Sequence, residues 1–326
     1  MLARFVRITA ASRLHFGLIR FGHASGRRFG GVGLMIEKPP LRLEVVSSPV
    51  FRSSGPVAER VEAAGRQWMK WRRLSELPNC RIEVVEAPPS HTGLGSGTQL
   101  SLAVGVALDI WTGQTCASAV ETAAGMGRGL RSAVGTHGFA QGGLIVELGK
   151  MPGEDISPMA SRVELPGDWR WVLICPRGIR GFHGTNEADM FRQLAPVPES
   201  VSNEMLCEMR ERMLPAARAG NLEDFGESVY RFGYQAGMCY AAVQLGAYCS
   251  DRAAQLVSAI RGSGIAGAGQ SSWGPTIFAL CENPDQAEWL VRELNHRGFL
   301  EDSDVVVSPT CNVGARIVSG DDKSES

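Results

Sequence analysis

Charged and apolar residues alternate along Arg4–Thr9, which predicts a half-buried strand near the start of the chain. Short apolar runs bounded by glycine, proline or polar residues predict five more strands in the first half, at 29–36, Leu41–Val46, Arg81–Val85, Leu144–Leu148 and Trp171–Cys175. Between them, Val57–Leu74 has the 3.6-residue period of an amphipathic helix, with Arg, Glu and Lys on its wet face. The first half therefore combines a sheet with helices.

From Ser202 onward the helical period dominates. It predicts four helices, at Ser202–Ala219, Leu222–Gln235, Asp251–Arg261 and Pro284–Arg297. Apolar runs predict a strand after Pro275 and a terminal strand at Asp304–Ser308 or Val313–Val318. Glycine, proline and serine cluster between Pro152 and Asp168, so we expect an α+β protein of two domains, 1–160 and 161–318, with a disordered tail at 319–326.

A glycine-rich segment opens directly into a long apolar helix in the sequence P-P-S-H-T-G-L-G-S-G-T-Q-L-S-L-A-V-G. The free N–H groups of such a helix start, with the positive end of the helix dipole, favour an anion. The segment predicts a phosphate or diphosphate cradle made by six residues: Gly93, Gly95, Ser96, Gly97, Thr98 and Gln99. Glycines at a helix start also serve packing, so a structural role stays open. Neither the Walker A pattern nor G-x-G-x-x-G is present.

Composition limits the partners. The 326 residues are 44% hydrophobic and 21% charged, with a net charge of −1, which is typical of a soluble globular protein and gives no basic excess for nucleic acid. The N-terminal sequence has no apolar secretion signal, and no apolar run is long enough to span a membrane. The eight cysteines lack zinc-ligand spacing. We therefore expect a cytoplasmic protein with reduced thiols, small-molecule substrates and no membrane or nucleic-acid partner.

Other polar segments also indicate chemistry. A loop is expected after Thr9 that carries Arg13 and His15, and a second segment, R-G-L-R-S-A-V-G-T-H-G, carries Arg131 and His137. The later sequence G-A-G-Q-S-S-W-G-P forms a second glycine-rich loop, and R-G-I-R-G-F-H-G-T-N-E contains Glu187. Each residue has a structural alternative. Arg13, His15 and Arg131 could be exposed to solvent, His137 could cap a turn, and Glu187 could be a carboxylate favoured at a helix start.

These ordered motifs together resemble the GHMP small-molecule kinase superfamily over the chain up to about Val318. Within it, S-R-L-H-F-G-L with F-G-G-V-G-L, then F-A-Q-G-G-L-I-V-E, and finally G-Q-S-S-W-G-P most resemble the β-ribofuranosylaminobenzene 5′-phosphate synthase family. The resemblance implies a ribosomal S5-like N-terminal domain and a ferredoxin-like C-terminal domain. It places the active site in the cleft between them, where Gly95 and Ser271 should face each other.

The same resemblance implies condensation of 5-phosphoribosyl 1-diphosphate with 4-aminobenzoate or 4-hydroxybenzoate, releasing diphosphate and CO2 on the route to tetrahydromethanopterin. It implies Mg2+ with the diphosphate, no organic cofactor and a homodimer, and it leaves the metal ligands unassigned. The implied catalytic residues are Arg13, His15, Arg131, His137 and Glu187. Further implied substrate-binding residues, beyond the glycine-rich segment, are Ser132, Thr136, Gln141, Gln270, Ser271 and Ser272. Arg128 is a further planar anion binder.

Two rival functions remain open at this point. One is an ATP-dependent kinase for a small alcohol, although His137-Gly138 is followed by F-A-Q-G-G-L, where a superfamily kinase has P-S-G-x-D with its activating aspartate. Phosphoryl transfer depends mostly on positioning and electrostatics, so the missing aspartate disfavours a kinase without excluding it. The other is a catalytically inactive binding protein, which the many polar residues in the predicted loops disfavour.

Overall fold

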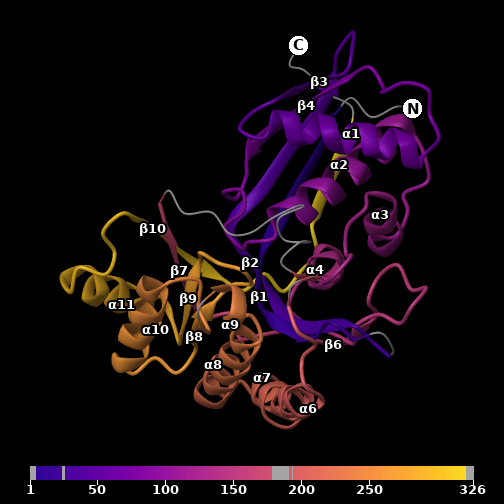
Figure 1. Cartoon of the computed structure of the whole chain (residues 1–326). Helices are drawn as coiled ribbons and strands as arrows, with labels where there is room; N and C mark the ends of the chain where they lie inside the picture. The colour runs from indigo at the N-terminus through magenta and orange to yellow at the C-terminus, as the bar shows by residue number, and fades with distance from the viewer. Residues whose placement is uncertain (1–4, 24–25, 178–190, 193, 245, 321–326) are drawn as a thin grey trace.

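A computed structural model describes residues 5–23, 26–177, 191–192, 194–244 and 246–320 (Figure 1). The first of its two sheets has seven strands in the order β11-β1-β2-β4-β3, with β5 paired to β2 and β6 to β5. These strands are β1 (Phe5–Arg20), β2 (Phe29–Ser47), β3 (Arg52–Ser54), β4 (Cys80–Glu86), β5 (Leu144–Glu147), β6 (Met159–Val163) and β11 (Arg316–Gly320). The two longest, β1 and β2, form an antiparallel ribbon that runs through the molecule.

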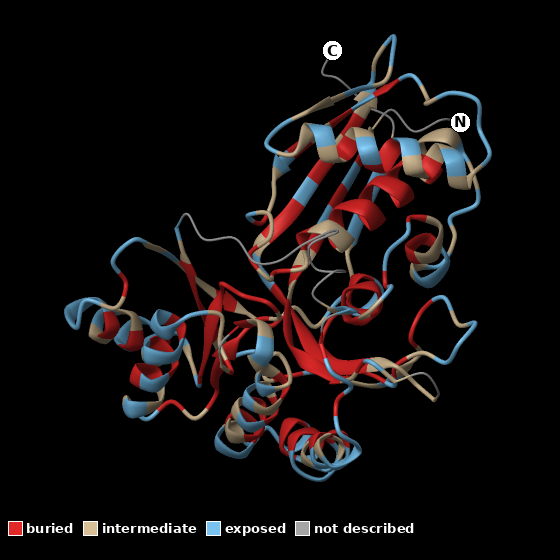
Figure 2. Cartoon of the chain, in the orientation of Figure 1, coloured by how far each residue is buried: buried red, intermediate tan, exposed pale blue. Residues whose placement is uncertain are grey.

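Four helices accompany this sheet: α1 (Ala58–Trp71), α2 (Ser96–Thr112), α3 (Ala119–Gly125) and α4 (Val134–Gln141). The alternation along β1 explains the packing, because Val6 and Ile8 are buried in the core shared with α1 and α2 whereas Arg7 is exposed. Helix α2 is buried along most of its length, and α1 presents a wet face to solvent (Figure 2). Trp68 of α1 donates to Asp109 of α2 at 2.8 Å, which fixes one helix against the other.

The second sheet has the order β10-β7-β9-β8 and is antiparallel throughout. Its strands are β7 (Arg170–Pro176), β8 (Ala268–Gln270), β9 (Ile277–Cys281) and β10 (Ser303–Pro309). Helices α10 (Asp251–Gly262) and α11 (Pro284–His296) pack on it, capped by Ser250 and Asn283. The sequence of strands and helices, β-α-β-β-α-β, is ferredoxin-like as predicted.

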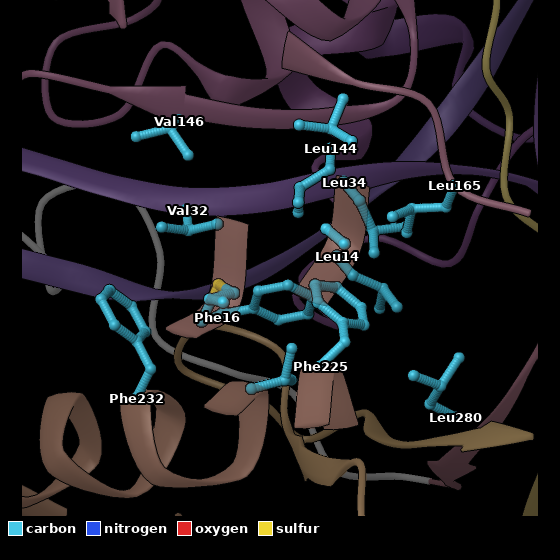
Figure 3. Packing of buried hydrophobic residues seen from close by; sticks show 14 of the residues in the cluster. Leu14, Phe16, Val32, Leu34, Leu144, Val146, Leu165, Phe225, Phe232 and Leu280 are labelled. Carbon is cyan, nitrogen blue, oxygen red and sulfur yellow. The ribbon is translucent and has the colours of Figure 1, made fainter. Parts of the chain in front are cut away.

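A third group of helices lies beside the two sheets, with α8 in contact with β1 of the first and β8 of the second (Figure 1). These helices are α6 (Glu199–Cys207), the π-helical η1 (Glu208–Met213), α7 (Leu214–Ala219), α8 (Leu222–Met238) and α9 (Ala241–Gln244). One core cluster joins Leu14 and Leu34 of the ribbon to Phe225 and Phe232 of α8 and to Leu280 of β9 (Figure 3). The two halves of the chain therefore share a continuous core. Among the described residues, no helix is both long and apolar enough to cross a membrane.

Several sequence-based boundaries need correction. The segment after Thr9 is not a loop, because Ser12–Arg20 stays paired with β2 through two bulges, at Ala10/Ser12 and at His15/Gly17. Both candidate terminal strands form, and β11 includes Ser319 and Gly320, which had been expected in the tail. The segment Arg128–Gly138 contains most of the unpredicted helix α4.

The division into two domains stays a prediction. Two strands of the first sheet nevertheless come from the expected domain boundary or from beyond it in the sequence. Strand β6 spans the expected boundary at 160 and pairs with β5 in the first sheet. Strand β11, from the C-terminal end, returns to pair with β1 in that same sheet. The first sheet is thus built from both ends of the chain. Strand β2 pairs with one edge of β1, and β11 pairs with the other.

Candidate functional site

The glycine-rich loop lies against strand β1 and opens α2. Gly93 and Gly95 have φ values of +88° and +70°, in the region that favours glycine, and Gly95 is the N-cap residue of α2. Leu94 accepts a hydrogen bond from the backbone N–H of Arg13 at 3.0 Å. The first N–H groups of α2 are thereby presented beside an arginine, which is the arrangement of an anion site.

The second glycine-rich loop meets the first directly. Ser271 Oγ donates to the carbonyl of Gly93 at 2.8 Å and accepts from the backbone N–H of His15 at 3.1 Å. The N–H of Ser272 donates to the carbonyl of His15 at 2.9 Å. The two loops and β1 therefore form one assembly, and the expectation that the loops face each other is confirmed.

Three arginines surround this helix start; we call Arg13, Arg60 and Arg128 the arginine cluster. A Cβ placed on Gly97 would lie 3.3 Å from Nη2 of Arg60 and 3.5 Å from Nη1 of Arg128. Burial lowers the pKa of Arg60, and burial together with the charge of Arg60 lowers the pKa of Arg128, although the side chain of Arg128 still reaches solvent.

Two members of the arginine cluster, Arg60 and Arg128, have no balancing carboxylate among the described residues. The guanidinium of Arg60 donates to Ser90 Oγ, and that of Arg128 donates to Ser101 Oγ, but neither forms an ion pair with any described residue. Two neighbouring like charges without a carboxylate repel each other, so an anionic ligand between them would relieve the repulsion.

A cavity of about 450 Å³ joins the arginine cluster to an apolar end. Phe191, Tyr240 and Trp273, here called the aromatic cluster, line that end, with ring centroids 4.4 Å apart for Tyr240 and Trp273 and 5.6 Å apart for Phe191 and Trp273. Arg131 lies with Cζ 4.8 Å from the centroid of the Phe191 ring and also lines the cavity. The cavity thus offers cationic groups at one end and aromatic faces at the other, a combination suited to an anion and a flat ring.

Two buried titratable groups lie beside this cavity. Burial and the charge of Arg13 lower the pKa of His15 well below its ordinary value, so the imidazole is neutral near pH 7. Its Nε2 has no hydrogen-bond partner among the residues that the structure describes. Burial raises the pKa of Glu147, a carboxylate that accepts a hydrogen bond from the N–H of Ala133 at 2.7 Å. His15 is among the cavity-lining residues and Glu147 is not.

The structure brings most of the sequence-predicted residues to one cavity. Those lining it are Arg13, His15, Gly93, Gly95, Ser96, Gly97, Thr98, Arg131, Ser132, Gln270 and Ser272, and Arg128 lies with them. Glu187 lies outside the described residues.

Five predicted residues do not line the cavity: Gln99, Thr136, His137, Gln141 and Ser271. Gln99 donates to the carbonyl of Gly135 at 2.8 Å, and His137 Nε2 lies 2.8 Å from the carbonyl of Ser157, so both tie local structure together. Ser271 bridges the two loops, and Gln141 is exposed at the end of α4.

Sequence reasoning missed Arg60 and the aromatic cluster. Arg60 occupies an ordinary polar position on the amphipathic helix α1, so no motif marks it. Trp273 lies within the G-Q-S-S-W-G-P motif, but Phe191 and Tyr240 come from distant segments that only the fold brings to it. The capping box at Ser118–Glu121 was a readable signal for the missed helix α3.

Comparison with known proteins identifies the family to which the chain belongs. The family model for the C-terminal part of GHMP kinases matches residues 213–299. A β-ribofuranosylphenol 5′-phosphate synthase of Archaeoglobus fulgidus is 32% identical over 85% of this chain and 88% of its own length. The chain belongs to the β-ribofuranosylphenol 5′-phosphate synthase family. Another member, from Methanocaldococcus jannaschii, is 30% identical over 95% of this chain and 99% of its own length.

Solved structures show the wider fold that the family shares. A homoserine kinase from Cytophaga hutchinsonii superposes with a TM-score of 0.67 at 15% identity, covering 97% of this chain and 98% of the other. A mevalonate pyrophosphate decarboxylase from Streptococcus pyogenes gives the same TM-score at 15% identity, covering 96% of this chain and 98% of the other. The GHMP kinase-like fold is therefore confirmed, and at these identities the likeness concerns the fold alone.

Proposed function

We propose that this protein condenses 5-phosphoribosyl 1-diphosphate with 4-aminobenzoate or 4-hydroxybenzoate and releases diphosphate and CO2, as a step toward tetrahydromethanopterin. The curated relatives carry the name of a synthase whose product joins a ribofuranosyl 5′-phosphate to a phenol. The kinase alternative gains no comparable support, because the kinases among the solved structures share only the fold.

One observation in the structure carries the proposal: a single cavity joins the aromatic cluster to Arg60 and Arg128, neither of which has an ion-pair partner in the described part of the chain. A phosphoribosyl diphosphate needs cations and helix N–H groups for its charged groups. An aromatic acid needs ring faces and one cation. We assign the diphosphate to the Gly93–Thr98 loop and the arginine cluster, and the aromatic ring to Tyr240 and Trp273.

The proposed reaction needs no base to remove a proton from the ring. The bond from the anomeric carbon to diphosphate breaks, and its electron pair leaves with diphosphate. The ring carbon that bears the carboxylate forms a new bond to the anomeric carbon, and the bond to CO2 then breaks and returns its electrons to the ring. Because CO2 takes the place of a departing proton, the chain's main task is to stabilise the diphosphate and align the two carbons.

Other residues have proposed roles within this scheme. Arg131, which stacks on Phe191 at the junction of the two ends, would hold the aryl carboxylate. Gln270 and Ser272 line the cavity beside the glycine-rich loop and would bind the 5′-phosphate. The neutral His15 would accept a hydrogen bond from the amino or hydroxyl group of the acceptor, since a protonated imidazole has no acceptor nitrogen.

We expect Mg2+ to enter with the diphosphate rather than on a protein carboxylate. None of the described residues that line the cavity is Asp or Glu, and no cluster of three metal-ligating side chains occurs in the described part of the chain. Hard oxygen donors suit Mg2+, and in this cavity the substrate would supply them. The metal would neutralise part of the departing charge. A cytoplasmic location and a homodimer stay predictions.

The proposal is tested by diphosphate release from phosphoribosyl diphosphate and Mg2+ in the presence and absence of each benzoate. We expect release to depend on the aromatic acid and the product mass to equal one ribosyl phosphate joined to aniline or phenol. Benzoate without a 4-substituent serves as the control, because it lacks the electron-donating group that activates the ring. Diphosphate release at one rate with or without the acid would contradict the proposal.

A further inference from the structure

Glu147 is a buried carboxylate beside the cavity that the proposed reaction does not use. It is 1% exposed, at the end of β5, whose four residues are all buried, and it lies opposite Gly31 of β2 in the sheet register. A carboxylate in such a position needs compensating partners, because burying an unpartnered charge is strongly unfavourable. Its partners therefore indicate what it holds.

The first partner is the start of helix α4. Ala133 is the N-cap residue of that helix, and Glu147 Oε2 accepts its N–H at 2.7 Å, as the glutamate of a capping box does. A strand residue thus caps the helix from outside. The residues immediately before the cap, Arg131 and Ser132, line the cavity, so the anchor fixes the turn that presents them.

The second partner is the charge of Arg13 on β1. That charge, like the Ala133 N–H and the hydroxyls of Ser132 and Ser157, favours the ionised form of Glu147 and opposes the effect of burial on its pKa. Arg13 in turn contacts the glycine-rich loop through its N–H to Leu94 and its Nη2 to the carbonyl of Gly93 at 3.5 Å. Glu147 therefore contacts the turn that carries Arg131, and the charge of Arg13 acts on its carboxylate.

We propose that Glu147 is a positioning residue that holds the Arg131–Ala133 turn in the arrangement that binds the substrate anions. The inference rests on the proposed function for the identity of those anions. Electrostatics alone makes the opposite prediction for its removal, because deleting a negative charge beside an anion site should tighten anion binding. Weaker diphosphate binding after the substitution therefore indicates a positioning role, and tighter binding indicates that only the charge matters.

The test is the affinity of the wild-type protein and Glu147→Gln for inorganic diphosphate, measured by titration calorimetry, with thermal unfolding in parallel. Glutamine keeps the size and an acceptor oxygen for Ala133 but replaces the charge-assisted hydrogen bond to the Ala133 N–H with a neutral one. We expect the dissociation constant to rise about tenfold, the scale of one charge-assisted hydrogen bond. The matched control is Glu154→Gln, which removes a carboxylate from the surface pair with Arg27 and should bind as the wild type does.

A second variant covers the case in which Glu147→Gln does not fold. Glu147→Asp keeps the charge but shortens the side chain, so it loses reach to Ala133, and it should also weaken diphosphate binding. Unchanged or tighter binding by the folded variants, or an equal loss in Glu154→Gln, would overturn the proposal. Wild-type protein that binds diphosphate without turning over the two substrates would overturn the proposed function alone, whereas wild-type protein that binds no diphosphate would overturn both.

Discussion

Ser271 Oγ donates a hydrogen bond to the carbonyl of Gly93 at 2.8 Å, across 178 positions of sequence. The contact is close enough that a Cβ on Gly93 would lie 2.3 Å from the carbonyl oxygen of Ser271. The two glycine-rich loops are therefore a single unit, in which the second loop supports the first. The close approach needs glycine at position 93, and this packing role is compatible with the proposed role of the loop in binding an anion.

Gly95→Val should abolish tight diphosphate binding while leaving a folded protein. The new Cβ would lie 2.9 Å from Cβ of Arg13, and the residue would keep a φ of +70° that valine disfavours by about 1–3 kcal/mol. Gly264→Val is the control, because its φ of +85° imposes the same strain in open space. Calorimetry with diphosphate distinguishes them, and wild-type affinity in folded Gly95→Val would contradict the cradle.

Arg131→Lys should lose about ten- to a hundredfold in kcat/KM although the charge is kept. Lysine cannot reproduce the planar fork or the stacking on Phe191, and a charge-assisted hydrogen bond is worth about 1.5–3 kcal/mol. Steady-state kinetics with each substrate varied in turn measures the loss. Arg7→Lys, at an exposed ion pair with Glu44, should be neutral, and near-wild-type turnover in Arg131→Lys would reduce Arg131 to a structural residue.

Arg60→Gln should weaken diphosphate binding by about tenfold or more and make that binding less dependent on salt. Arg60 lies beside the first turn of α2 without an ion-pair partner among the described residues, so its charge is available to a ligand. Arg66→Gln changes another arginine of the same helix, one exposed and paired with Glu62, and should leave the affinity unchanged. Equal effects of the two substitutions would show that only general surface charge matters.

His15 should make the fold less stable as the pH falls. Its pKa in the folded protein lies well below 6.5, whereas in the unfolded chain it is near that value, so between the two the unfolded state binds more protons. Stability then rises with pH through this window and is lost below it. The pKa of Glu147 is raised, so this group has the opposite effect: it lowers the stability of the fold as the pH rises above the ordinary pKa of a glutamate. Denaturant unfolding between about pH 7 and pH 5 should therefore show a smaller loss in His15→Gln than in the wild type, and identical slopes would contradict the buried neutral imidazole.

The features that could be predicted from the sequence are those written in local patterns. The start of α2 at Gly95 was visible because the glycines and the apolar helix after them are adjacent in the chain. The mixture of helices and strands in the second half was visible because these elements are short, regular and separated by turns, whereas their ferredoxin-like arrangement came from the family resemblance. Strand β1 was cut short in the prediction because its polar residues, Arg13 and His15 among them, interrupt the alternation where bulges shift the register.

The remaining features depend on tertiary contacts that no local pattern encodes. Arg60 reaches the glycine-rich loop because α1 packs on α2 through Trp68 and Asp109. The aromatic cluster forms only when three distant segments meet, and Glu147 caps α4 only because β5 pairs beside β2. An alanine at a helix start does not show in the sequence that a glutamate from a distant strand accepts its N–H. The proposed positioning role of Glu147 could therefore be found only in the structure.

The central claim, that the two substrates are joined in this cavity with release of diphosphate and CO2, is tested most directly with carboxyl-labelled 4-aminobenzoate and 4-hydroxybenzoate. The purified protein is incubated with either acid, phosphoribosyl diphosphate and Mg2+, first without ATP and then with it. We expect labelled CO2 and diphosphate in equal amounts from at least one of the acids, at a rate that ATP does not change. Labelled CO2 that appears only with ATP, or diphosphate released while the label stays in the acid, would contradict the account.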